Sequence, residues 1–172
     1  MDGIRKTRFD LKKRLSVSKE LSIEDNALFY SEWYFAAIHA LISVPGYQSI
    51  QSVSTYLGLD PAIVANAVEL LLKTGLLELS NGDLKIGQSQ THLGADSPFI
   101  SKHHMNWRLL AMQKIGSNKG DNLHYSSVVS LSFEDAIKIK EGLVSAIQDA
   151  KKIIRTSKEE TLQCFTLDFF KV

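Results

Sequence analysis

Apolar residues between positions 22 and 88 recur at helical spacing in three stretches and then alternate across a short turn. The first stretch starts at a capping box at residues 22–25 and continues to Pro45, which predicts one long first helix. The second stretch, at 49–58, is closed by a glycine, Gly58. The third, at 61–74, follows Asp60 and begins with Pro61, residues that favour a helix amino terminus. We therefore predict three consecutive helices in this part of the chain.

The turn after the third predicted helix favours a hairpin. Short apolar runs at 76–79 and 84–86 flank Asn81 and Gly82, a pair that is typical of two-residue hairpin turns. Three helices followed by a hairpin are the outline of a winged-helix domain, which we place at residues 22–88. The first helix would form the floor of its core.

The remaining chain alternates between helical and strand periodicity. Residues 97–115 predict a helix, and alternating apolar positions then predict a strand at 123–131. A second helix follows until about Thr156, and strand composition returns at 162–172. The pattern predicts an α+β protein in which a winged-helix domain is followed by a helix and a strand-helix-strand module. The two strands could be parallel, through a right-handed crossover, or antiparallel.

A sheet of two strands is only marginally stable alone, so it needs either the helix at 97–115 packed against it or additional strands from a second copy of the chain. We predict that residues 97–172 serve dimerisation and that the protein is a homodimer. Three aromatic residues of the last predicted strand are candidate partner-binding residues, because a strand edge can add to a partner's sheet. They are Phe165, Phe169 and Phe170. Packing inside the protein's own core is the alternative role.

Composition narrows the classes of partner. The 172 residues are 44% hydrophobic, enough to bury a core. Twenty basic and 19 acidic residues give a net charge of +1, so the chain lacks the global basic field that dominates nucleic-acid affinity. No run is long enough to span a bilayer and the first residues do not form a signal peptide. We expect no membrane partner and a cytoplasmic location.

DNA contact would therefore have to be local. On the outward side of the helix at 61–74, Asn66 could pair with adenine. Lys73 near the end of that helix and Lys85 in the hairpin could contact phosphate. Four neighbouring acids would repel phosphate: Asp60, Glu69, Glu78 and Asp83. This surplus favours a winged helix that serves structure or protein contact over one that binds DNA.

A basic block near the amino terminus could supply compensating charge. We treat residues 1–21 as a separate basic segment, since their cations could neutralise phosphate and make binding salt-sensitive. The candidate nucleic-acid-binding residues in it are Arg5, Lys6, Arg8, Lys12, Lys13 and Arg14. A solvated helix or linker is the alternative interpretation.

No motif indicates catalysis, a metal or a cofactor. His92, His103 and His104 lack the spacing of zinc ligands. Cys164 lies among apolar neighbours, which do not activate a thiolate. Glycine-rich phosphate loops and hydrolase motifs are absent from the sequence. We predict that the protein is not an enzyme and uses no cofactor.

Four motifs carry a resemblance to a known family. They are Ser31-Glu32-Trp33-Tyr34, Leu57-Gly58-Leu59 followed by residues 68–77, Asn106 to Arg108, and Phe165 to Phe170. From about residue 8 onward the chain resembles an uncharacterised bacterial family of transcriptional regulators that carry a conserved domain of unknown function. Longer members place a lambda-repressor-like helix-turn-helix ahead of that domain, and we expect this chain to lack it. The resemblance implies a role in transcription regulation.

Together the patterns favour a transcription-regulator-like winged-helix protein with a regulatory or scaffolding role and local DNA contact. The alternative is a protein-protein interaction module that has the winged-helix fold and does not bind nucleic acid. A small-ligand sensor with a pocket between the two halves is a third hypothesis.

Overall fold

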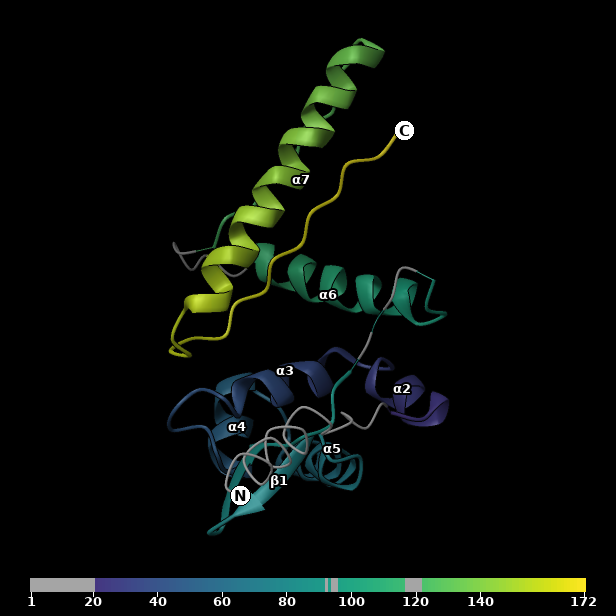
Figure 1. Cartoon of the computed structure of the whole chain (residues 1–172). Coiled ribbons are helices and arrows are strands. Elements are labelled where there is room, and N and C mark those ends of the chain that lie inside the picture. The colour runs from purple at the N-terminus through teal and green to yellow at the C-terminus, as the bar shows by residue number, and fades with distance from the viewer. Residues whose placement is uncertain (1–20, 92, 94–95, 117–121) are drawn as a thin grey trace, which may run out of the picture. The chain divides into compact units, whose positions relative to one another are not determined.

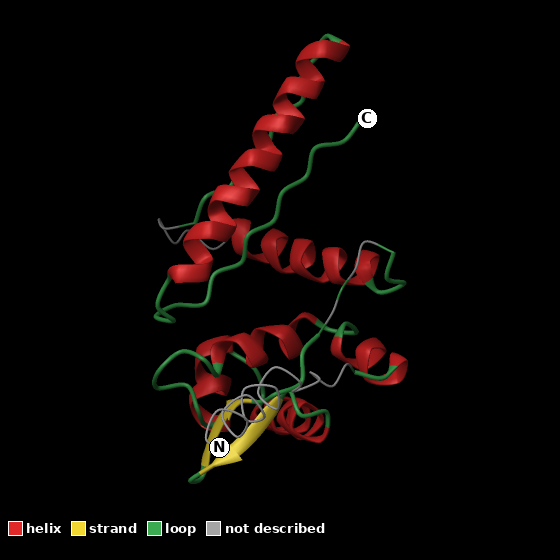
Figure 2. Ribbon diagram, in the orientation of Figure 1, coloured by secondary structure: helices red, strands yellow, loops and turns green. Residues whose placement is uncertain are grey.

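The computed structural model of the chain describes residues 21–91, 93, 96–116 and 122–172. The chain divides into two compact units, Met1–Asn106 and Trp107–Val172. Within the described residues there are six helices and one small two-stranded antiparallel sheet (Figures 1 and 2). The mixed α and β composition therefore agrees with the sequence prediction.

The prediction of one long first helix was wrong, because two helices occupy these residues. They are α2 (Ile23–Phe29), which Ser22 caps as predicted, and α3 (Trp33–Leu41). The break lies at Tyr30, whose carbonyl oxygen accepts a hydrogen bond from Asn106 Nδ2 at 2.9 Å. In a continuous helix that carbonyl would accept from a residue four positions on. A distant side chain takes this acceptor, so local periodicity could not locate the break.

The next two helices form at the predicted positions, as α4 (Ile50–Leu57) and α5 (Pro61–Lys73). Ser49 caps α4, and Gly58 ends it in the left-handed conformation with a φ of 66°. Asp60 accepts a hydrogen bond from the first turn of α5 at 2.7 Å. Helix α5 packs against α3, α4 and the first strand, which makes it the central element of the unit.

The predicted hairpin is present as β1 (Leu77–Ser80) and β2 (Asp83–Ile86). Asn81 and Gly82 have positive φ angles of 55° and 89°, as this hairpin turn requires. The helices and the hairpin enclose an apolar core. Its largest fully buried side chains are Ile38, Leu41, Val53, Val64, Leu71, Leu76 and Leu77.

Two further helices follow, α6 (Ile100–Ile115), which contributes residues to both units, and α7 (Phe133–Thr156). The strands predicted at 123–131 and 162–172 are not formed. Among the described residues these segments make no backbone-backbone hydrogen bond, and β1 and β2 form the one sheet. The prediction was wrong because alternating side chains do not supply the neighbouring strand that a ladder needs. No helix in the described part of the chain is long and apolar enough to cross a membrane.

Candidate nucleic-acid and partner interface

The outer side of α5 carries the first candidate residues. Its core-facing positions are Val64, Ala67, Val68 and Leu71, all buried. Asn66 and Lys73 are exposed and lie seven residues apart, which places them on the same side of the helix. Glu69 is exposed between them. The helical period that buries the apolar residues therefore also presents a short polar row to solvent.

The hairpin adds the third described candidate, Lys85 of β2. Lys85 is paired in register with Glu78, and its Nζ donates to Ser80 Oγ at 3.1 Å. All four acids predicted to oppose phosphate are exposed: Asp60, Glu69, Glu78 and Asp83. Four acids against two lysines leave the described part of this face with an acidic surplus. The basic residues Arg5, Lys6, Arg8, Lys12, Lys13 and Arg14 lie outside the described residues.

A shallow groove beside α4 was not predicted from the sequence. Its lining residues are Tyr47, Ser49, Gln51, Ser52, Thr55 and Tyr56. The two tyrosine rings meet edge to face, with centroids 4.8 Å apart. Hydroxyl and amide groups such as these hydrogen-bond to phosphate oxygens or to polar protein groups. The signal in the sequence was the run of Ser, Thr and Gln at 49–55, which had been interpreted only as part of a helix.

His39 is held in the core by packing and by one hydrogen bond. Its Nε2 donates to the Leu76 carbonyl oxygen at 3.2 Å, which ties α3 to the residue before β1. Burial lowers the pKa of His39, and the hydrogen bond opposes this shift. His39 is therefore neutral at neutral pH and has a structural role.

His103, His104 and Cys164 are the other described candidates for metal or nucleophilic chemistry. The His103 ring lies edge-on to Tyr30 at 5.5 Å, and burial, followed by the neighbouring His104, lowers the pKa of His103. Partial burial raises the pKa of the Cys164 thiol, which disfavours the reactive thiolate. The described residues contain no group of three metal-ligating side chains. His92 lies outside them.

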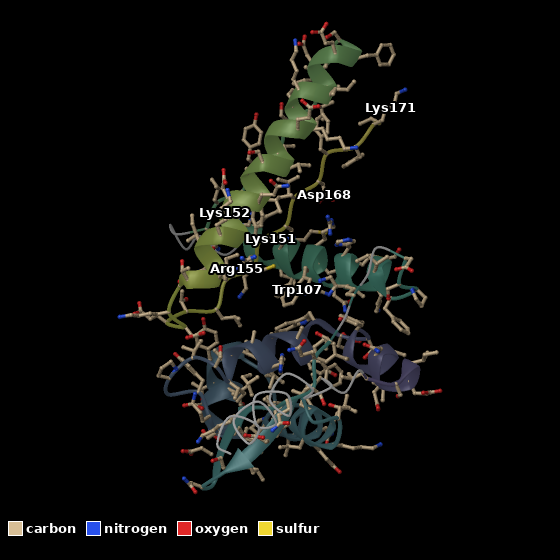
Figure 3. All side chains as sticks on the ribbon, in the orientation of Figure 1. Trp107, Lys151, Lys152, Arg155, Asp168 and Lys171 are labelled. Carbon is tan, nitrogen blue, oxygen red and sulfur yellow. The ribbon has the colours of Figure 1, made fainter. Side chains whose placement is uncertain are left out.

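The three aromatic candidates of the tail are exposed, with fractions of 63% for Phe165, 43% for Phe169 and 78% for Phe170. Asp168, labelled in Figure 3, lies among them and forms an ion pair with Arg108 of α6. Arg108 Nε lies 2.9 and 2.8 Å from the two carboxylate oxygens. This ion pair ties the tail to α6, and the three aromatic side chains remain exposed beside it.

Helix α7 begins with acids and ends with bases, with Lys138, Lys140, Glu141 and Asp149 between them. Its first turn contains Glu134 and Asp135, whereas Lys151, Lys152 and Arg155 gather near its end (Figure 3). This helix was predicted only from its apolar repeat. The acids at its start and the bases at its end could have been read from the same residues of the sequence.

These features define a protein of mixed α and β structure with one buried core, an exposed α5 face and an uncovered carboxy-terminal helix. The chain belongs to the DUF4423 family, which is described as a domain of unknown function and whose match covers residues 12–172. No curated protein and no solved structure shows significant similarity to the chain.

Proposed function

We propose that residues 22–88 form a winged-helix domain and that the protein is transcription-regulator-like, with a regulatory or scaffolding role. Helices α3, α4 and α5 and the hairpin follow one another in the order of that fold. The exposed side of α5 is the observation that carries the proposal. Helix α5 packs against α3, α4 and β1 and turns Asn66 outward, as a helix that enters a major groove would.

DNA contact in this proposal is local and sensitive to salt. Asn66 would hydrogen-bond to adenine, while Lys73 and Lys85 would neutralise phosphates. The acidic surplus on the same face weakens this contact, so the amino-terminal basic block supplies most of the favourable charge. Each neutralised phosphate releases a counterion, and the affinity therefore falls as salt rises.

The acidic surplus also favours a second function, a protein-protein interaction module that keeps the winged-helix fold without binding nucleic acid. The uncharged groove beside α4 fits this role, since its two tyrosine rings can pack against apolar groups of a protein partner and its hydroxyl and amide groups can pair with polar ones. A fold by itself does not choose between these functions.

Homodimerisation through residues 97–172 completes the proposal, because a dimer would present two α5 faces to one partner or operator. A cytoplasmic location and the absence of a catalytic role or cofactor belong to the same proposal. A regulatory or scaffolding protein acts by binding and needs neither catalytic residues nor a cofactor.

Fluorescence anisotropy with random duplex DNA at low and moderate salt tests the proposed function. We expect an affinity that falls steeply with salt and collapses when the six basic residues of the amino-terminal block are changed to Gln. The variant Lys73→Gln with Lys85→Gln should reduce the salt slope by about two, one for each phosphate contact. The matched control, Glu69→Gln with Asp83→Asn, removes acids from the same face and should strengthen binding.

Binding no tighter than about 100 μM at low salt would favour the interaction module, since non-specific DNA binders reach that range. A DNA affinity that is the same in the wild type and in the variant of the basic block would contradict the proposed role of that block. Circular dichroism of each variant checks that the fold is retained.

A further inference from the structure

The carboxy-terminal unit has no buried side chain among its described residues. Val128 is 90% exposed, Phe133 88% and Ile153 69%. A unit without a core cannot offset the conformational entropy of an ordered chain, and isolated helices are marginal in water. Another surface must therefore cover this unit.

Helix α7 has two different sides. The half-buried side carries Ala136, Leu143, Ile147 and Ala150. A second side, exposed throughout, follows the alternating three- and four-residue spacing of a coiled-coil seam. We define the seam as Glu134, Ile137, Glu141, Val144, Gln148, Lys151 and Arg155. A groove at its centre is lined by Ile137, Lys140, Glu141, Val144, Ser145 and Gln148.

Charge along the seam is divided between its two halves. The first half carries Glu134 and Glu141, and the second carries Lys151 and Arg155. Glu134 is paired within the helix to Lys138 at 2.8 Å. In the described structure, by contrast, Glu141, Lys151 and Arg155 form no ion pair. The seam therefore offers an unpaired acid, Glu141, in its first half and two unpaired bases, Lys151 and Arg155, in its second half.

We propose that the seam binds a second copy of the chain, with α7 antiparallel to the partner's α7 and the twofold axis near Val144. This inference rests on the proposed homodimerisation and adds its geometry. The antiparallel orientation places each acidic half against a basic half and aligns the two helix dipoles favourably. A parallel pair would bring like charges together.

The symmetry of the seam selects a second copy as the occupant. A twofold axis supplies the opposite order of charges from the same residues, as isologous interfaces do. The unit also has enough apolar surface, since its exposed aromatic side chains are Tyr125, Phe133, Phe165, Phe169 and Phe170. Aromatic residues bury about 150–250 Å² each, so covering these five would provide much of the roughly 800 Å² per partner that stable interfaces bury.

Disulfide cross-linking of the full chain tests this arrangement in a Cys164→Ser background. Val144→Cys lies at the proposed axis, so mild oxidation should give a covalent dimer as the main product. Ala146→Cys is the matched control, because it lies two residues on and about 200° around the same helix. It should remain largely monomeric under denaturing conditions. Both positions are exposed, so neither change disturbs a core.

Charge reversal gives a second measurement that does not depend on cysteine. Lys151→Glu with Arg155→Glu should raise the dissociation constant of the dimer by about tenfold, because all four seam charges become acidic. Adding Glu134→Lys and Glu141→Lys should restore the dimer, since the reversed seam is again complementary to itself. Sedimentation equilibrium measures the dissociation constant of the dimer for each of these two variants.

The outcomes separate this inference from the proposed homodimer. A protein that stays monomeric at its highest soluble concentration would contradict both. A dimer in which Val144→Cys cross-links no better than Ala146→Cys, and in which charge reversal changes nothing, would overturn the α7 pairing alone. The homodimer would then use another surface.

Discussion

The two units of the chain use their apolar residues in opposite ways. In the amino-terminal unit Ile38, Leu41 and Leu71 are fully buried, because the short helices α3, α4 and α5 and the hairpin pack against one another. In the carboxy-terminal unit the 24-residue helix α7 has no buried residue. The same kinds of side chain therefore stabilise the fold of one unit and remain available to a partner in the other.

This difference predicts different consequences of substitution. Changes in the core of the amino-terminal unit should alter the free energy of unfolding whatever the protein concentration. Changes on α7 should alter association and have little effect on the unfolding of a monomer. The following experiments test the contrast, beginning with the largest expected effect.

Leu71→Ala should destabilise the protein by about 3–5 kcal/mol, because it removes a fully buried side chain and leaves a cavity between α5 and its neighbours. The matched change Ile153→Ala on α7 removes a 69% exposed side chain. It should cost less than about 0.5 kcal/mol. Urea unfolding at low protein concentration measures both. Equal losses would mean that α7 belongs to the cooperative core.

Asn106→Ala should cost about 1–3 kcal/mol, because the Tyr30 carbonyl loses its donor in a buried site. Gln113→Ala is the control on the same helix and removes an exposed amide. It should change the unfolding free energy by less than about 0.5 kcal/mol. A similar loss in both variants would show that the helix, and not the hydrogen bond, determines the effect.

His39 should make the amino-terminal unit less stable in mild acid. Burial lowers the pKa of His39 in the folded protein, so the unfolded chain binds more protons below the ordinary value of 6.5. This contribution to stability is present above about pH 6.5 and is lost as the pH falls toward the folded-state pKa.

His39→Gln keeps an N–H donor for the Leu76 carbonyl and removes the titration. Urea unfolding at about pH 7.5 and about pH 5.5 should show a smaller pH dependence in this variant. His103, whose pKa is also lowered by burial, should account for part of the remaining dependence. An unchanged pH dependence would exclude His39 as its source.

The Arg108–Asp168 ion pair should make the smallest contribution, up to about 1 kcal/mol, because both side chains are partly exposed. A double-mutant cycle with Arg108→Gln and Asp168→Asn measures the coupling free energy. Added salt should weaken it. A coupling well above that range would indicate that the tail is held more firmly than its exposed aromatic residues suggest.

The elements with strong local signals were predicted closely. Ser22 and Asp60 cap helices as predicted, Gly58 ends α4, and Asn81-Gly82 forms the hairpin turn. Each signal acts over a few residues, so the sequence alone was sufficient. The break at Tyr30 and the missing strands at 123–131 and 162–172 depend on partners distant in the chain or outside it.

The candidate site was predicted less completely than the fold. The exposure of Asn66 and Lys73 follows from the helical period of α5. The position of Lys85 opposite Glu78 follows from the register of the hairpin. The groove beside α4 depends on Tyr47 and Tyr56 meeting across a turn, which spacing does not specify. Winged-helix identity, DNA contact and homodimerisation stay predictions.

The sequence by itself determined the helix caps, the hairpin and the charge order along α7, because each depends on residues within a few turns of one another. Only the tertiary structure decided that Asn106 interrupts the first helix at Tyr30, that His39 bonds to Leu76, and that the carboxy-terminal unit has no core. The physical reason is that burial depends on which distant surfaces meet. An apolar pattern indicates that one face of an element must be buried, but it does not indicate which surface buries that face.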